Sequence, residues 1–139
     1  MLSMSGSMPN IAYFEVPADD VKRAKKFYAE ILGWEFIPTQ IPGIPVEYWN
    51  ISTGKSRKDT LNMGGLYQRK EQSSRMLMYA IVDDIDKTLE KVETLGGKIM
   101  SPKMSLDTVG NLVTIIDSEG NLMGLWEREK QAAKYPHSG

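Results

Sequence analysis

The sequence predicts an α+β protein of two βαβββ modules, whose strands form a curved, incompletely closed eight-stranded sheet around a central cavity. The main observation is a pattern of strand, acidic pair, helix and glycine that occurs twice. Val16 and Val82 close the two leading strands 66 positions apart, and Gly33 and Gly96 follow the two helices 63 positions apart. Because neither module could cover its apolar sheet alone, we expect the two sheets to curve together.

The composition limits the function more than the fold. The 139 residues suffice for one domain, which we place at 10–127 with modules at about 10–68 and 76–127, between a flexible segment at 1–9 and a polar tail at 128–139. The net charge of −1 and the lack of a long apolar run predict neither a nucleic-acid nor a membrane partner. Cysteine is absent, which excludes disulfides and thiolate chemistry, and a cytoplasmic protein is the default expectation. The single histidine, His137, lies in the polar tail.

The first module begins with a strand at 10–16, in which side chains alternate between two faces. One face is apolar and should pack on the following helix: Ala12, Phe14 and Val16. The other face should line the cavity: Ile11, Tyr13 and Glu15. Asp19 or Asp20 can cap the helix, and Gly33 can end it in a left-handed conformation. The spacing predicts one buried helical stripe: Val21, Ala24, Phe27 and Ile31.

Three further strands complete this module at 34–38, 46–51 and 61–67. The last one contains Gly64-Gly65, where we expect a bulge or a close approach of the backbone. Tyr48 and Trp49 are neighbours in a strand and point to opposite faces, so only one of them can face the cavity. The pattern does not decide which.

The second module repeats the plan with a strand at 76–82 and a helix at 85–95 capped by Asp83 or Asp84. Its predicted buried stripe is Ile85, Leu89, Val92 and Leu95. A strand at 98–100, a loop at 101–107 and strands at 111–116 and 122–126 follow.

The alternation of side chains selects residues for a largely apolar pocket. We predict that it is lined by Ile11, Tyr13, Glu15, Trp49, Met63, Leu77, Tyr79, Gly124 and Trp126, with Tyr48 as the alternative to Trp49. Glu15 stands out among them, because a buried carboxylate needs a partner or a ligand. Glu15 and Tyr13 are the candidate catalytic residues, which would serve together as acid and base.

Several segments together resemble one family. They are Phe14-Glu15-Val16-Pro17-Ala18-Asp19-Asp20, Ala24-Lys25-Lys26-Phe27-Tyr28, Leu32-Gly33-Trp34, Val82-Asp83-Asp84, Leu95-Gly96-Gly97 and Asp117-Ser118-Glu119-Gly120-Asn121. Their order and spacing over residues 10–127 resemble the glyoxalase, bleomycin-resistance and extradiol-dioxygenase group, the vicinal oxygen chelate superfamily. The resemblance implies the paired βαβββ fold and a small-molecule cavity.

Enzymes of that superfamily typically hold one divalent metal with His, Glu or Gln from the first and last strands of each module. The resemblance places these ligand positions on Ile11 or Tyr13, near Leu77, on Gly64 or Gly65, and on Gly124. Only tyrosine among these residue types can bind a metal, and then weakly, so we predict no family-type metal site and no cofactor. A hard cation at Glu15, Glu47 or Glu127 is possible but disfavoured.

The resemblance and the missing ligands together predict a binding protein that sequesters a small organic molecule, such as a drug or a metabolite, as a homodimer. The alternative is a lyase, isomerase or dioxygenase that uses Glu15 and Tyr13 or an atypical metal site. A third possibility is an interaction module with a vestigial pocket.

Overall fold

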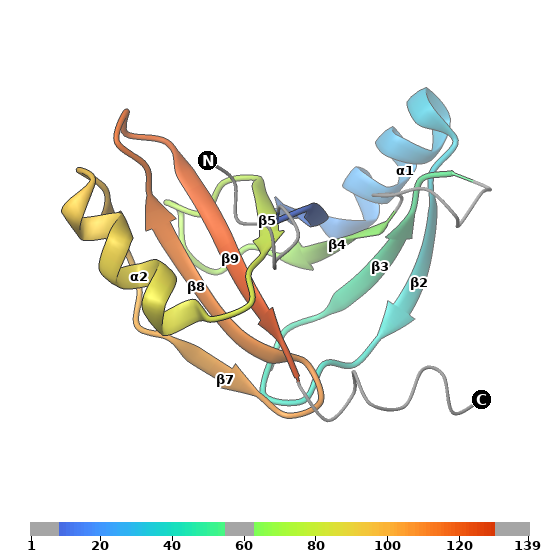
Figure 1. Ribbon diagram of the computed structural model, residues 1–139. Coiled ribbons are helices and arrows are strands. Elements are labelled where there is room, and N and C mark those ends of the chain that lie inside the picture. Colours follow the sequence, from blue (N-terminus) through green and yellow to red (C-terminus); the bar gives the residue numbers. More distant parts are fainter. Residues whose placement is uncertain (1–8, 55–62, 130–139) are drawn as a thin grey trace. The chain divides into compact units, whose positions relative to one another are not determined.

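The computed structural model describes residues 9–54 and 63–129, which contain nine strands and two helices (Figure 1). The described residues divide into two compact units. The N-terminal unit comprises 12–78, and the C-terminal unit comprises 79 onward together with the residues up to Ile11. The predicted α+β class with one helix in each half is confirmed. The predicted flexible segment and polar tail lie almost entirely outside the described residues.

The N-terminal unit contains the first helix and a four-stranded mixed sheet. Its elements are β1 (Ile11–Ala18), α1 (Val21–Leu32), β2 (Glu35–Thr39), β3 (Tyr48–Ser52) and β4 (Met63–Gln68). The strand order is β2-β3-β4-β1, with β4 parallel to β1 and antiparallel to β3. The register through Gly64 and Gly65 is unbroken on both sides, so these glycines form no bulge.

Helix α1 begins at Asp20, whose carboxylate accepts a hydrogen bond of 3.0 Å from the backbone N–H of Arg23. It ends at Gly33, which has a φ of 74°. The predicted buried stripe is only half right. Val21 is buried, but Phe27 and Ile31 are 57% and 63% exposed. Tyr28 packs against the core in their place, because the helix turns the Val21, Ala24 and Tyr28 side toward the sheet.

The core of the N-terminal unit lies between α1 and one face of its sheet. Val16, Ile51 and Leu66 supply buried side chains from three strands. Five aromatic residues pack against them: Phe14, Tyr28, Trp34, Phe36 and Trp49. The predicted packing of Phe14 and Val16 toward the helix is therefore confirmed.

The C-terminal unit repeats this plan. Its elements are β5 (Leu77–Ile81), α2 (Ile85–Thr94), β6 (Lys98–Ile99), β7 (Met104–Leu106), β8 (Gly110–Ile116) and β9 (Leu122–Arg128). The strand order is β5-β9-β8-β6, and β7 also pairs with β8. The prediction of a loop throughout 101–107 is wrong, because residues 104–106 pair with 110–112. This extra strand raises the strand count above the predicted eight.

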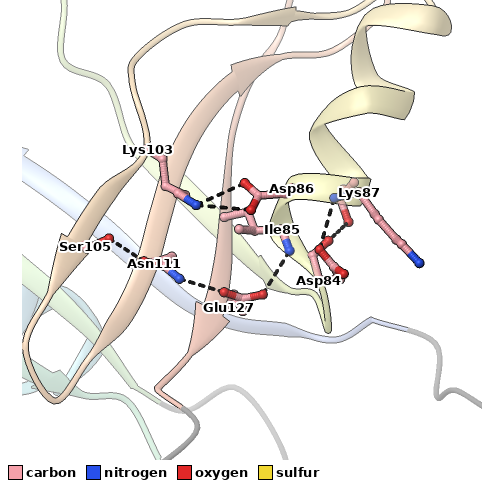
Figure 2. A network of polar contacts seen from close by, with 9 residues as sticks. Asp84, Ile85, Asp86, Lys87, Lys103, Ser105, Asn111 and Glu127 are labelled. Carbon is pink, nitrogen blue, oxygen red and sulfur yellow. Dashed lines mark hydrogen bonds and ion pairs between the residues drawn. The ribbon is translucent and has the colours of Figure 1, made fainter.

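Helix α2 is held at its start by two carboxylates (Figure 2). Asp84 accepts from the backbone N–H of Lys87 at 3.1 Å, and Glu127 of β9 accepts from that of Ile85 at 3.1 Å. Glu127 also accepts from the Asn111 side chain at 2.6 Å. Ile85 is buried, whereas Leu95, which we predicted to close the buried stripe, is 73% exposed because the helix ends before it. Within the described residues, no helix is long and apolar enough to cross a membrane.

Candidate functional site

A chain of polar side chains lies on the face of the N-terminal sheet that α1 does not cover. Tyr13 and Glu15 alternate along β1 with the core residues of the opposite face. Tyr48 of β3 connects them, because its hydroxyl lies 2.7 Å from the Tyr13 hydroxyl and donates to Glu15 Oε2 at 2.9 Å. The structure thus brings both candidate catalytic residues into one hydrogen-bonded group.

A second set of hydrogen bonds orients Tyr13. The hydroxyl of Thr39 donates to the carbonyl of Ile37 at 3.2 Å, and it accepts from Asn50 Nδ2 at 2.9 Å. The amide nitrogen of Asn50 is therefore fixed toward Thr39, and its carbonyl oxygen lies 3.4 Å from the Tyr13 hydroxyl. Residues of β1, β2 and β3 together form one directed network.

The two phenols of the group stay protonated over the whole physiological pH range. Burial is the main cause for both residues, and the negative charge of Glu15 acts in the same direction. These effects outweigh the hydrogen bond between Tyr13 and Tyr48, which acts in the opposite direction, and raise the pKa of Tyr13 to about 12. The pKa of Tyr48 lies far above its ordinary value. Both residues therefore act as neutral hydrogen-bonding groups and not as bases.

Gly65 provides the space in which Tyr48 lies. A Cβ atom at this position would have three atoms of the Tyr48 side chain, including the hydroxyl oxygen, within 2.7 Å. The backbone of Gly65 is ordinary strand, so space and not conformation requires glycine here. Tyr67, the cross-strand partner of Tyr48, stacks on it with ring centroids 6.4 Å apart and an interplanar angle of 11°. Tyr48 is therefore held at a fixed position beside Glu15.

The segment between β2 and β3 forms an open pocket of about 650 Å³ beside this group. Its lining comes from residues between Pro38 and Trp49 and includes Thr39 and Tyr48 of the polar network. All of the lining residues belong to the N-terminal unit.

Trp49 lies on the other face of β3 from Tyr48. Its ring packs against the core cluster, and Lys25 Nζ lies 3.2 Å from the ring centroid. Its indole N–H donates to Glu47 at 3.0 Å. The structure thus places Tyr48, and not the predicted Trp49, with Tyr13 and Glu15.

The other predicted pocket residues are distributed over both units. Met63 is exposed at the start of β4, and Ile11 is exposed at the start of β1. In the C-terminal unit, Tyr79 lies opposite Gly124, and the indole of Trp126 donates to the carbonyl of Val109 at 2.9 Å. Leu77 is half-buried in β5. The common pocket that we predicted from these residues stays a prediction.

Sequence reasoning missed Asn50, Tyr67 and the specific role of Gly65. Asn50 could have been found, because it follows Tyr48 by two positions and so lies on the same strand face. The pairing of Tyr48 with Tyr67 depends on strand register, which the sequence pattern does not contain.

The described residues do not fit the metal that the family commonly holds. Two of the family's ligand positions fall on Gly64 or Gly65 and on Gly124, and none of these glycines carries a ligating side chain. At Gly124 a Cβ atom would come within 2.9 Å of three atoms of the Tyr79 ring, as happens at Gly65 with Tyr48. At Gly65 and at Gly124, tyrosine side chains thus occupy the space that a larger residue would need. Among residues 9–54 and 63–129, no three His, Cys, Asp or Glu residues come together as a metal-binding group.

Comparisons with known proteins agree with this fold. A family profile described as bleomycin resistance protein-like N-terminal matches residues 10–44. A glyoxylase-like domain-containing protein of Didymella fabae is 33% identical over 121 residues, which cover 85% of this chain and 93% of that protein. The putative glyoxylase CFP32 of Mycobacterium bovis is 25% identical over 118 residues, and the match spans only 45% of its length. The chain belongs to the glyoxalase-like proteins of the vicinal oxygen chelate superfamily.

Solved structures show the same fold at low identity. An uncharacterised protein from Methanosarcina mazei is 23% identical with a TM-score of 0.56, and the match covers 87% of this chain and 95% of that one. The hypothetical protein BH1468 from Bacillus halodurans is 12% identical with a TM-score of 0.65, covering 88% and 96%. Methylmalonyl-CoA epimerase from Mycobacterium tuberculosis is 15% identical with a TM-score of 0.61, covering 88% and 90%. At these identities the likeness concerns the fold alone.

Proposed function

We propose that this protein binds and sequesters a small organic molecule, through contacts that need no metal ion. The observation that carries the proposal is the group of Tyr13, Tyr48 and Glu15, joined by hydrogen bonds of 2.7 and 2.9 Å on the sheet face opposite α1. Ligand sites commonly combine aromatic surface with a few fixed polar groups, and this group supplies both. The match to a bleomycin resistance protein-like profile supports a binding role.

The polar group has features of a binding site and not of a core. A carboxylate away from water is costly unless it is hydrogen-bonded, and a packed core would be cheaper with an apolar residue in its place. The tyrosine rings add rigid apolar surface, because tyrosine has few rotatable bonds. We infer that Tyr13 and Tyr48 orient the ligand and that Glu15 fixes one of its polar atoms.

The proposal is tested with the full-length chain after treatment with a chelator. A library of small organic compounds is screened by thermal shift, and the hits are measured by calorimetry. A ligand at 100 times its Kd adds about 2.7 kcal/mol of stability, which is easily detected. The affinity of each hit is then measured for the Tyr13→Phe and Glu15→Gln variants.

Two matched variants serve as controls. Tyr28→Phe removes a phenol hydroxyl from the core side of the unit, and Glu35→Gln removes an exposed carboxylate from β2. We expect the hits to bind about tenfold more weakly to the site variants and with unchanged affinity to the controls. The proposal fails if no compound binds, or if the hits bind equally to the site variants and the controls.

Metal-free proton transfer is the second candidate function. The direct link from a phenol to a carboxylate favours it, since an isomerase or a lyase could use Glu15 as base and Tyr13 as acid. Methylmalonyl-CoA epimerase, which shares the fold, is named for an epimerisation. Incubating each hit with the protein in D₂O would reveal turnover as exchange of a carbon-bound hydrogen, and Glu15→Gln should abolish it. Hits that bind without any exchange would leave sequestration as the function.

We further infer that the protein works as a cytoplasmic homodimer, which its superfamily resemblance suggests. Light scattering on the purified full-length chain tests the dimer, because a monomer at micromolar concentration would contradict it. Fractionation of cells that express the chain tests the compartment.

A further inference from the structure

Helix α1 exposes a second apolar stripe beside the one that packs on the sheet. Phe27 and Ile31 lie one turn apart on the same side of the helix, and they are 57% and 63% exposed. Ala24, three residues before Phe27, is half-buried at the border between this stripe and the core. We call Ala24, Phe27 and Ile31 the outer stripe. Their alternating spacing of 3 and 4 residues is typical of a helix that packs against another helix.

The second helix of the chain shows that the fold itself does not need this stripe. Helix α2 follows the same plan from its own cap, Asp84. Seven residues after the cap, α1 has Phe27 and α2 has Lys91, which is exposed. Aromatic residues are enriched in protein interfaces and lysines are depleted there. The difference between the two helices therefore indicates that this face of α1 meets a partner.

Two opposite charges border the outer stripe. Arg23 and Glu30 are seven residues apart, which is close to two full turns, so both lie on the same side of the stripe. Both are exposed, and Glu30 makes an ion pair of 3.2 Å with Lys26 on the helix surface. If a second α1 lies against the first in the opposite direction, Arg23 of each helix comes beside Glu30 of the other. The outer stripe is thus complementary in charge to a second copy of itself, as an interface with twofold symmetry requires.

The sizes of the apolar side chains fit the same arrangement. A twofold axis near the middle of α1 places Phe27 of each helix over the small Ala24 of the other, so that the two helices can approach closely. Parallel helices would instead bring the two Arg23 side chains to one end of the contact and the two Glu30 side chains to the other end. Both the sizes and the charges therefore favour the antiparallel direction.

We propose that the outer stripe is the contact through which two copies of this chain form a dimer, with their α1 helices antiparallel. The proposal rests on the homodimer proposed above and identifies its interface. Phe27 and Ile31 supply the apolar contact, and Arg23 and Glu30 set the direction of the helices. Each contact occurs twice, because the same surface serves both copies.

The first test measures the dissociation constant of the dimer by sedimentation equilibrium on the full-length chain. Phe27→Lys gives α1 the residue that α2 has at the equivalent place. Leu95→Lys is the matched control, because Leu95 is 73% exposed and belongs to the C-terminal unit. We expect Phe27→Lys to weaken the dimer at least about 100-fold, since a buried phenylalanine is lost twice, and Leu95→Lys to leave it unchanged. Circular dichroism verifies that both variants remain folded.

The second test reverses the charges that border the stripe. Arg23→Glu and Glu30→Arg each place like charges side by side twice in the dimer, so each variant alone should dimerise about tenfold more weakly. An equimolar mixture of the two variants should form a heterodimer with about the wild-type affinity. One helix then carries only negative charges at these two positions, and the other carries only positive charges.

The outcomes separate the interface from the homodimer itself. A wild-type chain that stays monomeric at micromolar concentration would refute the homodimer and this interface together. A dimer that Phe27→Lys leaves intact would refute the interface while the homodimer stands. A dimer that Phe27→Lys disrupts, but that the mixture of charge variants does not restore, would overturn the antiparallel arrangement.

Discussion

Replacing Gly65 with alanine tests whether the position of Tyr48 organises the site. The added Cβ would have three atoms of the Tyr48 side chain within 2.7 Å, so one of the two residues must move. Gly65 has ordinary strand geometry, which alanine adopts without strain. The steric conflict with Tyr48 is therefore the main effect of the substitution.

The expected cost follows from the contacts that Tyr48 would lose. Its hydrogen bond to the Glu15 carboxylate contributes about 1.5–3 kcal/mol, and its bond to Tyr13 about 0.5–1.5 kcal/mol. If the ring stays and the strand shifts instead, overpacking costs about 1–3 kcal/mol. We expect Gly65→Ala to lower the free energy of unfolding of the wild-type chain by about 2–4 kcal/mol.

The assay is urea unfolding followed by circular dichroism, in a double-mutant cycle with Tyr48→Ala. Removing the ring also removes the conflict, so Gly65→Ala in the Tyr48→Ala background should cost less than about 1 kcal/mol. The difference between the two backgrounds measures the coupling of the pair. If Gly65→Ala costs the same in both backgrounds, Tyr48 does not lie over Gly65 and the arrangement of the site is refuted.

Three further predictions concern ionisation and stability. Because the pKa of Tyr13 is raised to about 12 from an ordinary value of 10.0, its contribution is complete below pH 10 and is lost toward pH 12. We expect Tyr13 to account for about 2–3 kcal/mol of the stability lost over this range, measured as the difference between the wild-type chain and Tyr13→Phe in urea titrations at each pH. Asp84→Ala should lower the free energy of unfolding by about 1 kcal/mol, because it removes the cap of α2. Replacing the exposed Asp83 with alanine should leave this free energy nearly unchanged in the same assay. Leu66→Ala, at a fully buried position, should lower the free energy of unfolding by about 2–5 kcal/mol. The exposed Leu95→Ala should lower it by less than about 0.5 kcal/mol. Equal shifts of the melting temperature in the two variants would contradict the assigned core.

The repeat in the sequence was enough to predict the order of most elements, because strand alternation and glycine exits are local signals. The choice between Asp19 and Asp20 needed the structure, since both residues can cap and only the coordinates show that Asp20 accepts from the backbone N–H of Arg23 while Asp19 accepts from Arg69. The buried stripe of α1 was predicted incorrectly at Phe27 and Ile31. Two overlapping stripes share Val21 and Ala24, and only tertiary packing selects the one with Tyr28.

The two residues that β1 contributes to the candidate site could be predicted from the sequence. Tyr13 and Glu15 follow from alternation along β1, and they are polar on a strand whose other face is apolar. The choice of Tyr48 over Trp49 was not predictable, because strand periodicity gives opposite faces without saying which face is the core. The role of Gly65 depends on Tyr48 lying across two strands, a relation set by register.

The most direct test of metal-independent binding is a calorimetric titration of the strongest hit into chelator-treated protein, verified to be free of metal by mass spectrometry. We predict the same Kd before and after addition of nickel, zinc or iron(II), and a loss of about tenfold in Tyr13→Phe but none in Tyr28→Phe. Binding that requires the added metal and is indifferent to Tyr13→Phe would contradict the proposed site.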